Sequence, residues 1–412
     1  MERLKDDRSF IFTALGAAMG LGNALRFPGL CAKYGGAFII AYAAVLVFIG
    51  FPLLKCEFAL GKRLRSPFPC AMRAFGRFPY AAGWAACVNS ALIAIYYSAV
   101  IARLACSAAD FSTGGNFYCL QDTSAPYKIL TVAAWAVLFL LLTRGSLFRA
   151  RLARAAVCFQ TVMLIVLAAR GLIFNNSFSA LRALFVPRSQ SFADPSMWLG
   201  ALGQGLLSLS VAAGVMPAFA EAMPERLSDG RCAAIVIAAN FCGCILSSVA
   251  MTTNAYGVTL ASEISENGFK NAFTLYPAIL GTAFKNAVSR GIFGALFFLS
   301  LALTAVVSAI SLLSAPLSPL SRIIPRRRAA LALCSSCACF SVLLALFPDG
   351  IYAADFVTCA VAAPLIALSE SAVFIFNARF FFRGLTVRRA GGKINAGCKA
   401  NKIGRWVKVW RR

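Results

Sequence analysis

The chain has 412 residues, of which 60% are hydrophobic and only 13% are charged, a balance that excludes an ordinary soluble domain. Histidine is absent, which excludes histidine-based acid–base catalysis and histidine metal sites. The formal net charge of +25 needs an explanation, either in an anionic partner or in an orientation across a membrane.

Apolar runs long enough to cross a bilayer recur from one end of the sequence to the other. The sequence therefore predicts an all-α polytopic membrane protein, embedded in the lipid bilayer, with about ten transmembrane helices. We place these at residues 9–31, 36–60, 84–108, 127–143, 153–174, 196–221, 231–256, 290–317, 329–347 and 352–382.

Lysine and arginine gather in alternate loops, whereas the loops between them carry few. The basic segments are residues 3–8, 62–77, 144–154, 226–231, 322–328 and a tail at 386–412. The positive-inside rule places such segments in the cytoplasm. We therefore expect a multi-pass protein of the cytoplasmic (inner) membrane with both termini in the cytoplasm. The charge then needs no nucleic-acid partner, and we expect none.

The first apolar run contains an unusual stretch at residues 16–28, GAAMGLGNALRFP. Gly20, Gly22 and Asn23 lie close together there, and each glycine weakens a helix by about 1 kcal/mol relative to alanine. One interpretation is a discontinuous helix whose freed backbone groups bind a ligand, because a bilayer tolerates broken backbone only beside a cavity or inside protein. The other is a helix-packing face formed by Gly16 and Gly20. Spacing alone leaves both open.

The second run carries a glutamate, Glu57, in an apolar setting. A charged side chain there costs at least about 2.5–3.5 kcal/mol, so we expect it to have a partner in the protein. Alternatively, Glu57 lies near the cytoplasmic interface of the membrane.

Several ordered motifs resemble the first two helices of the neurotransmitter:sodium symporter family. They are GxxxGLGNxxRFP, then Gly35-Gly36-Ala37-Phe38, Tyr42, Gly50-x-Pro52 and Glu57-x-x-x-Gly61, and the resemblance continues to about Phe382. It implies a 5+5 inverted repeat with broken helices 1 and 6, with repeat one at about 9–174 and repeat two at about 196–382. The transporter core would be residues 1–385, followed by the basic cytoplasmic tail.

The resemblance implies a bacterial sodium-dependent amino-acid transporter rather than an enzyme. We expect sodium-coupled symport of a neutral, apolar amino acid across the cytoplasmic membrane by alternating access. The alternative is a non-transporting membrane protein of the same fold that binds an amino acid as a sensor or regulator. Glu57 would brace the unwound part of helix 6.

The resemblance also implies where sodium ions bind. Sodium site one would use the Ala18 carbonyl, the side-chain oxygens of Asn23 and Asn240, and Ser208, completed by the substrate carboxylate. Sodium site two would use the carbonyls of Gly16, Met19 and Ala305 and the Ser308 hydroxyl. The family has a further hydroxyl beside Ser308, where this chain has Ala309, so the second site lacks one expected ligand.

The implied substrate pocket is made of small and apolar residues with a few hydroxyls. It comprises Ala17, Ala18, Gly20, Gly22, Ile93, Tyr97, Leu207, Ser208, Ser210, Ala213 and Leu313. Gly20 stands where monoamine carriers have an aspartate, which favours an amino acid over a lone amine. Leu207 and Ala213 replace bulky aromatic residues of the family, which favours a large side chain.

Gate and chloride positions follow from the same resemblance. Arg26 and Asp355 match the outer gate pair. The inner gate is poorly matched, because Ile323 stands where an aspartate is expected. Tyr42, Gln204, Ser208 and Asn240 match four positions of the family's chloride site, and Cys244 takes the fifth, so chloride binding is left open.

Overall fold

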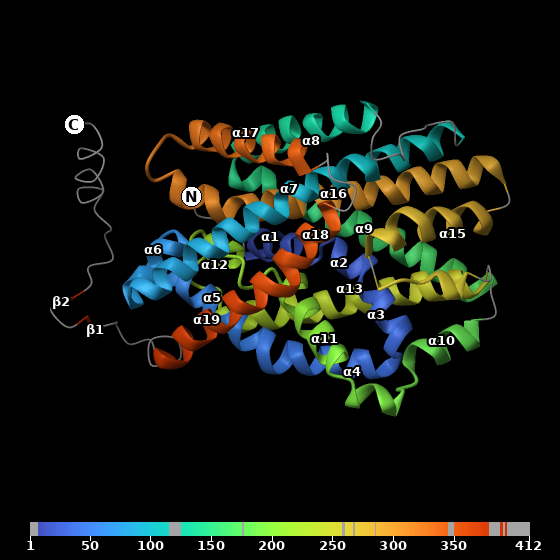
Figure 1. Ribbon diagram of the computed structural model, residues 1–412, viewed down its shortest axis with the longest axis horizontal. Helices are drawn as coiled ribbons and strands as arrows, with labels where there is room; N and C mark the ends of the chain where they lie inside the picture. The colour runs from blue at the N-terminus through green and yellow to red at the C-terminus, as the bar shows by residue number, and fades with distance from the viewer. Residues whose placement is uncertain are drawn as a thin grey trace.

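The structure is a computed structural model that describes residues 7–114, 125–174, 177–257, 260–266, 268–284, 286–344, 350–378, 388–389 and 392–393. The described chain is almost entirely helical, and its long helices run roughly parallel to one another (Figure 1). The one sheet among these residues pairs β1 (Arg388–Arg389) antiparallel with β2 (Gly392–Lys393) in the basic tail.

The first half contains α1 (Asp7–Ala18), α2 (Leu21–Leu25), α3 (Phe27–Tyr34), α4 (Gly36–Val45), α5 (Phe51–Leu64), α6 (Phe68–Met72), α7 (Arg77–Thr113), α8 (Ala125–Thr143) and α9 (Ser146–Phe174). The second half contains α10 (Ser177–Phe185), α11 (Pro195–Ser208), α12 (Val215–Ala220), α13 (Asp229–Gly257), α14 (Gly268–Lys270), α15 (Tyr276–Ala283), α16 (Ala287–Leu320), α17 (Arg326–Leu344), α18 (Gly350–Asp355) and α19 (Ala363–Phe376).

Short π-helical turns at Leu46–Gly50, Asn271–Leu275 and Phe356–Ala362 continue into α5, α15 and α19. Three short 3₁₀ turns, at Arg73–Phe75, Ser189–Ala193 and Ala261–Glu263, lie in the connections.

Seven helical segments of the described chain are long and apolar enough to cross a membrane. They are Gly36–Leu64, α7, α9, α13, α16, α17 and Ala353–Phe376. An eighth is a bent pair, in which α1 and Leu21–Tyr34 meet at 53°, so the first predicted span is broken. The remaining two predicted spans correspond to α8, whose apolar part Tyr127–Thr143 is shorter, and to α11 with α12. The inverted relation of the two halves stays a prediction.

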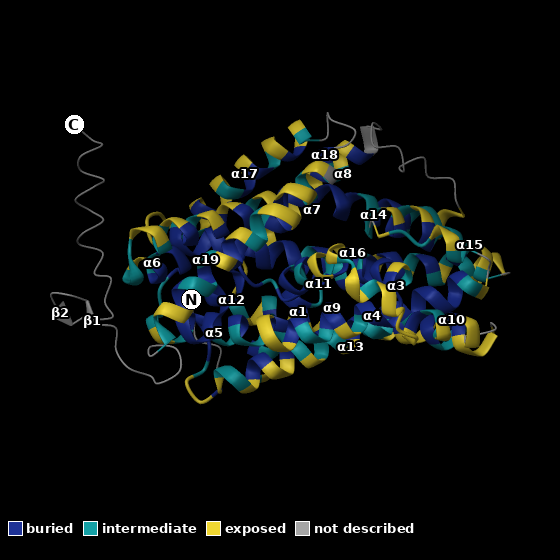
Figure 2. Ribbon diagram, turned by 60° about the horizontal axis from the view of Figure 1, so that its bottom comes forward, coloured by how far each residue is buried: buried dark blue, intermediate teal, exposed yellow. Residues whose placement is uncertain are grey.

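The outward faces of the bundle carry large apolar side chains. Phe48, Ile129 and Leu368 are 78%, 67% and 68% exposed, and they come from three different spans. Figure 2 shows exposed residues along the outer faces of helices such as α7, α10 and α17. A water-soluble protein rarely exposes apolar surface on this scale, whereas a lipid-facing surface requires it.

The two interrupted segments lie inside the bundle. Helix α1 packs against α9, α13 and α16, whereas α12 packs against α5 and α16. The longest helices, α7 and α16, lie side by side, and α16 packs against both α1 and α12. The break between α1 and α2 and the break between α11 and α12 are therefore held near each other by continuous helices.

Candidate functional site

The first break leaves Met19 and Gly20 outside regular helix. Gly20 is extended, with φ −90° and ψ −172°. A Cβ at Gly20 would lie only 3.2 Å from Ser308 Oγ, so the small residue lets the break approach α16. The Ala17 carbonyl at the end of α1 accepts a hydrogen bond of 2.9 Å from the Ser210 hydroxyl, which ties the first break to the second.

The second break is a strained turn between Ser208 and Val215. Ser210, Ala212 and Gly214 have φ values of 50°, 57° and 67°. A left-handed conformation costs a residue with a Cβ about 1–3 kcal/mol, and such strain persists only where the surroundings impose it. Glu57 Oε1 accepts a hydrogen bond of 2.8 Å from the Ala212 N–H, and the Glu57 side chain is fully buried. The glutamate on α5 thus fixes this turn.

Asn23 and Asn240 form the polar centre of the site. Asn23 Nδ2 donates to Asn240 Oδ1 at 2.7 Å and to the Ala18 carbonyl at 3.4 Å. Asn240 Nδ2 donates to Tyr42 Oη at 2.8 Å and to Ser208 Oγ at 3.2 Å. This chain of bonds fixes the orientation of both amides.

One acceptor in this network is left over. Asn23 Oδ1 is buried and has no hydrogen-bond partner among the described residues. An unsatisfied buried acceptor costs about 1–3 kcal/mol, and a hard cation with oxygen ligands would satisfy it. The donor set at sodium site one therefore fits a cation at Asn23. The Asn240 side-chain oxygen, also predicted as a ligand, accepts a hydrogen bond from the Asn23 amide in this structure.

The residues of sodium site two lie where α1 contacts α16. Ser308 Oγ is buried and likewise unpartnered in the described chain. Ala309 beside it is fully buried and offers no oxygen from its side chain. The predicted carbonyl donors come from the last turn of α1 (Gly16), the break (Met19) and the middle of α16 (Ala305).

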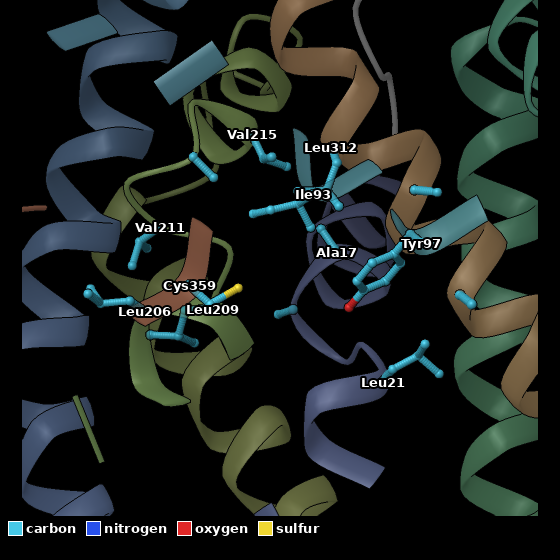
Figure 3. Packing of buried hydrophobic residues seen from close by; sticks show 14 of the residues in the cluster. Ala17, Leu21, Ile93, Tyr97, Leu206, Leu209, Val211, Val215, Leu312 and Cys359 are labelled. Carbon is cyan, nitrogen blue, oxygen red and sulfur yellow. The ribbon is translucent and has the colours of Figure 1, made fainter. Parts of the chain in front are cut away.

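A cavity lies between the two breaks and α7, and it contains most of the predicted substrate pocket. Its lining includes Ala17, Gly20, Gly22, Asn23, Asn89, Ile93, Tyr97, Leu206, Leu207, Ser208, Ser210, Val211, Ala213, Ser308, Leu312, Cys359 and Ala363. Figure 3 shows Ala17, Ile93, Tyr97 and Leu312 around the end of α1. Two predicted residues, Ala18 and Leu313, do not line it, and Leu312 takes the place of Leu313. Adjacent helical residues point about 100° apart, so a shift of one position changes the face.

The predicted chloride residues gather only in part. Tyr42 Oη lies 2.7 Å from Ser208 Oγ and 3.7 Å from Cys244 Sγ, and Asn240 completes this group. Gln204 instead donates to the Gly22 carbonyl at 3.2 Å. Three of the four predicted residues therefore pair with one another, and the fourth contacts α2.

The predicted outer gate residues face a second, larger cavity of about 290 Å³, which we call the vestibule. Its lining includes Arg26, Tyr97, Leu207, Glu266, Phe269 and Asp355. Arg26 and Asp355 are both among the described residues, and no ion pair joins them; Asp355 accepts a hydrogen bond of 2.9 Å from the Tyr96 hydroxyl. The vestibule reaches Leu207 and Tyr97, which also line the inner cavity.

The opposite end of the bundle, which we call the basic end, is held by ion pairs. Glu221 follows α12, and its carboxylate accepts a hydrogen bond from the Ser318 hydroxyl and lies 3.5 Å from Arg322. Arg65 donates to the Glu221 carbonyl at 2.7 Å. Further pairs join Arg226 to Asp7 at 3.0 Å and Lys62 to Asp229 at 3.2 Å. Ile323, where an acid was expected, is 55% exposed.

Sequence reasoning missed two polar residues of the site. Glu221, the residue after α12, pairs with Arg322 at the basic end, where the resemblance implied an acid after α16. Asn89 lines the inner cavity from α7, one turn before Ile93 and two turns before Tyr97. The signal for Asn89 was its spacing of four and eight residues from these predicted pocket residues, which places all three on one helix face.

Comparisons with known proteins agree with this architecture. The chain is 26% identical over 380 residues to an uncharacterised sodium-dependent transporter of Methanocaldococcus jannaschii, covering 85% of this chain and 75% of that protein. It is 27% identical over 311 residues to the mouse sodium-dependent neutral amino acid transporter B(0)AT3, covering 64% of this chain and 51% of the relative. The chain spans about half the length of the mammalian relatives it matches.

A solved structure shows the same fold. MhsT, crystallised in complex with L-phenylalanine, superposes with a TM-score of 0.81 at 21% identity, covering 92% of this chain and 90% of that one. The profile of the sodium:neurotransmitter symporter family, whose members are transporters and not enzymes, matches residues 2–110 and 120–381. Together with the two broken helices around a shared cavity, this match shows that the chain belongs to the sodium:neurotransmitter symporter family.

Proposed function

We propose that the protein is a sodium-coupled symporter of a neutral, largely apolar amino acid that works by alternating access. The observation that carries the proposal is the unpartnered, buried Asn23 Oδ1 beside a cavity built from two helix breaks. A cation at this oxygen would make the cavity's affinity for a carboxylate depend on sodium. Sodium would be held there by Asn23, Ala18 and Ser208, with Asn240 positioning the Asn23 amide.

The cavity supports a neutral amino acid as the substrate. Among the described residues that line it, no side chain is charged. The backbone amides near Gly22 and the Tyr97 hydroxyl can bind a carboxylate, and carbonyls at the breaks can accept hydrogen bonds from an ammonium group. Ile93, Val211 and Leu312 provide apolar surface for the side chain.

The charge distribution supports one orientation of the protein in the membrane. Arg65, Arg226 and Arg322 lie at the basic end, so the positive-inside rule places that end in the cytoplasm and the vestibule outside. Substrate would enter through the vestibule and leave at the basic end. Chloride at the Tyr42 group is a further option within this proposal.

Uptake into proteoliposomes tests the proposal. Purified protein is reconstituted, and uptake of a panel of amino acids is measured with an inward sodium gradient and with potassium in its place. We expect saturable, sodium-dependent uptake of neutral amino acids and no competition by monoamines. Uptake that is indifferent to sodium, or equal displacement by dopamine-like amines, would overturn it.

One observation favours a non-transporting amino-acid sensor instead. At sodium site two, Ala309 stands where the family has a hydroxyl. The missing hydroxyl lowers the affinity for one of the two sodium ions that could drive transport. The same proteoliposomes distinguish the two functions. Sodium-dependent binding without uptake would establish the sensor, whereas uptake establishes the symporter.

A further inference from the structure

Three buried side-chain polar atoms of the cavity-lining residues have no hydrogen-bond partner in the described part of the chain. They are Asn23 Oδ1, Ser308 Oγ and Asn89 Oδ1. The first two lie at the proposed sodium positions. Asn89 lies at neither, so its acceptor is open to a different partner.

The orientation of the Asn89 amide is fixed by its neighbour. Asn89 Nδ2 donates to the Thr358 carbonyl at 3.2 Å, and a carbonyl can only accept. The nitrogen therefore faces the π-helical turn Phe356–Ala362, and the oxygen is the free end of the amide. The side chain is only 3% exposed, so bulk water does not solvate that oxygen.

Asn89 lines the cavity from α7. It precedes Ile93 by one helical turn and Tyr97 by two, and Tyr97 also reaches the vestibule. The adjacent Ser90 hydroxyl donates to the Ala213 carbonyl in the second break, which anchors this part of α7 to the cavity wall. The neighbouring wall is apolar, with Leu312 and Ala363.

We propose that Asn89 is a specificity-determining residue that selects neutral amino acids whose side chain ends in an N–H or O–H donor. The side chain would have an apolar body, such as an indole or a phenol, and its donor would bond to Asn89 Oδ1. This inference rests on the proposed function and names the substrate class more narrowly. A buried acceptor that loses its donor is left unsatisfied, so the site discriminates against analogues that lack the donor.

Pairs of ligands that differ only in the donor test this proposal. Competition binding to the purified full-length protein in sodium compares tryptophan with 3-benzothienylalanine, in which sulfur replaces the indole N–H, and tyrosine with phenylalanine. We expect the wild type to prefer each donor-bearing ligand about tenfold. In Asn89→Leu, which removes the acceptor at similar volume, the ratio should fall to within about twofold. A wild-type ratio near one, or a preference that persists in Asn89→Leu, would overturn the assignment.

Thr131→Ala is the matched control. It removes a buried hydroxyl that donates to the Tyr127 carbonyl within α8, away from the cavity lining, and should keep the wild-type ratio. Each ratio is measured within one variant, so it does not depend on the fraction of folded protein. If amino acids bind in a sodium-dependent way but without a donor preference, the proposed role of Asn89 is wrong and the proposed function is unaffected. If no amino acid shows sodium-dependent binding, both the proposed function and this inference are wrong.

Discussion

Asn23 and Asn240 have the same side chain but different positions in the hydrogen-bond network. Asn23 keeps a free oxygen, whereas the oxygen of Asn240 accepts from Asn23 and its nitrogen donates to Tyr42 and Ser208. We therefore propose separable roles: Asn23 as a ligand to sodium and Asn240 as the residue that orients the Asn23 amide.

Removing the ligand should abolish sodium dependence. We expect Asn23→Ala to lose sodium-dependent substrate binding, and Asn240→Ala to weaken it because the Asn23 amide loses its acceptor. Equilibrium binding of labelled substrate across a sodium titration measures both. Ser248→Ala is the control, because its buried hydroxyl bonds to the Cys244 carbonyl within its own helix. Wild-type sodium dependence in Asn23→Ala would contradict the assignment.

Ala309 leads us to a second prediction, about the affinity and steepness of sodium binding. The second site retains the Ser308 hydroxyl and three carbonyls but lacks one hydroxyl, worth about 1.5–3 kcal/mol when it binds a charge, or roughly ten- to a hundredfold in affinity. We expect a Hill coefficient for sodium near one in the wild type and a steeper, tighter curve in Ala309→Ser. A steep wild-type curve that the substitution leaves unchanged would show that another oxygen completes the site.

Much of the site could be predicted from residue identity, and the exceptions have a physical reason. Gly20 and Gly22, just before Asn23, made a break one of two interpretations because glycine weakens a helix, and the structure has the break there. Leu313 and Asn89 show the limit, because helix rotation decides which side chain faces a cavity, and rotation depends on packing against neighbouring helices. The cavity lining contains Leu312, whereas the resemblance implies its neighbour Leu313.

At the scale of elements, the second break shows why a turn can form without glycine at every left-handed position. Gly205 and Gly214 flank the break, but Ser210 and Ala212 adopt positive φ despite having a Cβ. Propensity alone argues against that conformation. The compensation comes from a different helix, because Glu57 on α5 accepts the Ala212 N–H. Local sequence could not reveal a partner 155 residues away.

The hydrogen bond between Glu57 and the Ala212 N–H leads to a prediction about the stability of the fold. Glu57→Leu leaves the Ala212 N–H without an acceptor and should lower the free energy of unfolding by about 1–3 kcal/mol. Glu57→Gln retains an oxygen for that N–H and should lose less. Thermal unfolding in detergent, with sodium-dependent binding as a second readout, compares the two. Equal stability of Glu57→Leu and the wild type would show that the turn holds itself.

At the scale of the whole molecule, the two ends of the bundle differ. Among the described residues, the vestibule end has one ion pair, Lys33–Glu266, and Arg26 and Asp355 do not pair with each other. The basic end has three ion pairs, which involve α1, α5 and the segments after α12 and α16. A transporter needs such an asymmetry, since the cavity must open to one side at a time. We propose that this asymmetry corresponds to a state open towards the vestibule.

Glu221 should set the balance between the states that open at opposite ends. Its carboxylate is 4% exposed, but its partner Arg322 is 54% exposed, so solvent screens the pair and its loss is worth about 1 kcal/mol, or roughly a fivefold change in the equilibrium. We expect Glu221→Gln to increase hydrogen–deuterium exchange in α1 and in the last turns of α16, and to weaken substrate binding from the vestibule. Glu266→Gln is the control, because it breaks the Lys33–Glu266 pair of 2.7 Å at the vestibule end. If hydrogen–deuterium exchange at the basic end is the same in both variants as in the wild type, Glu221 does not hold that end closed.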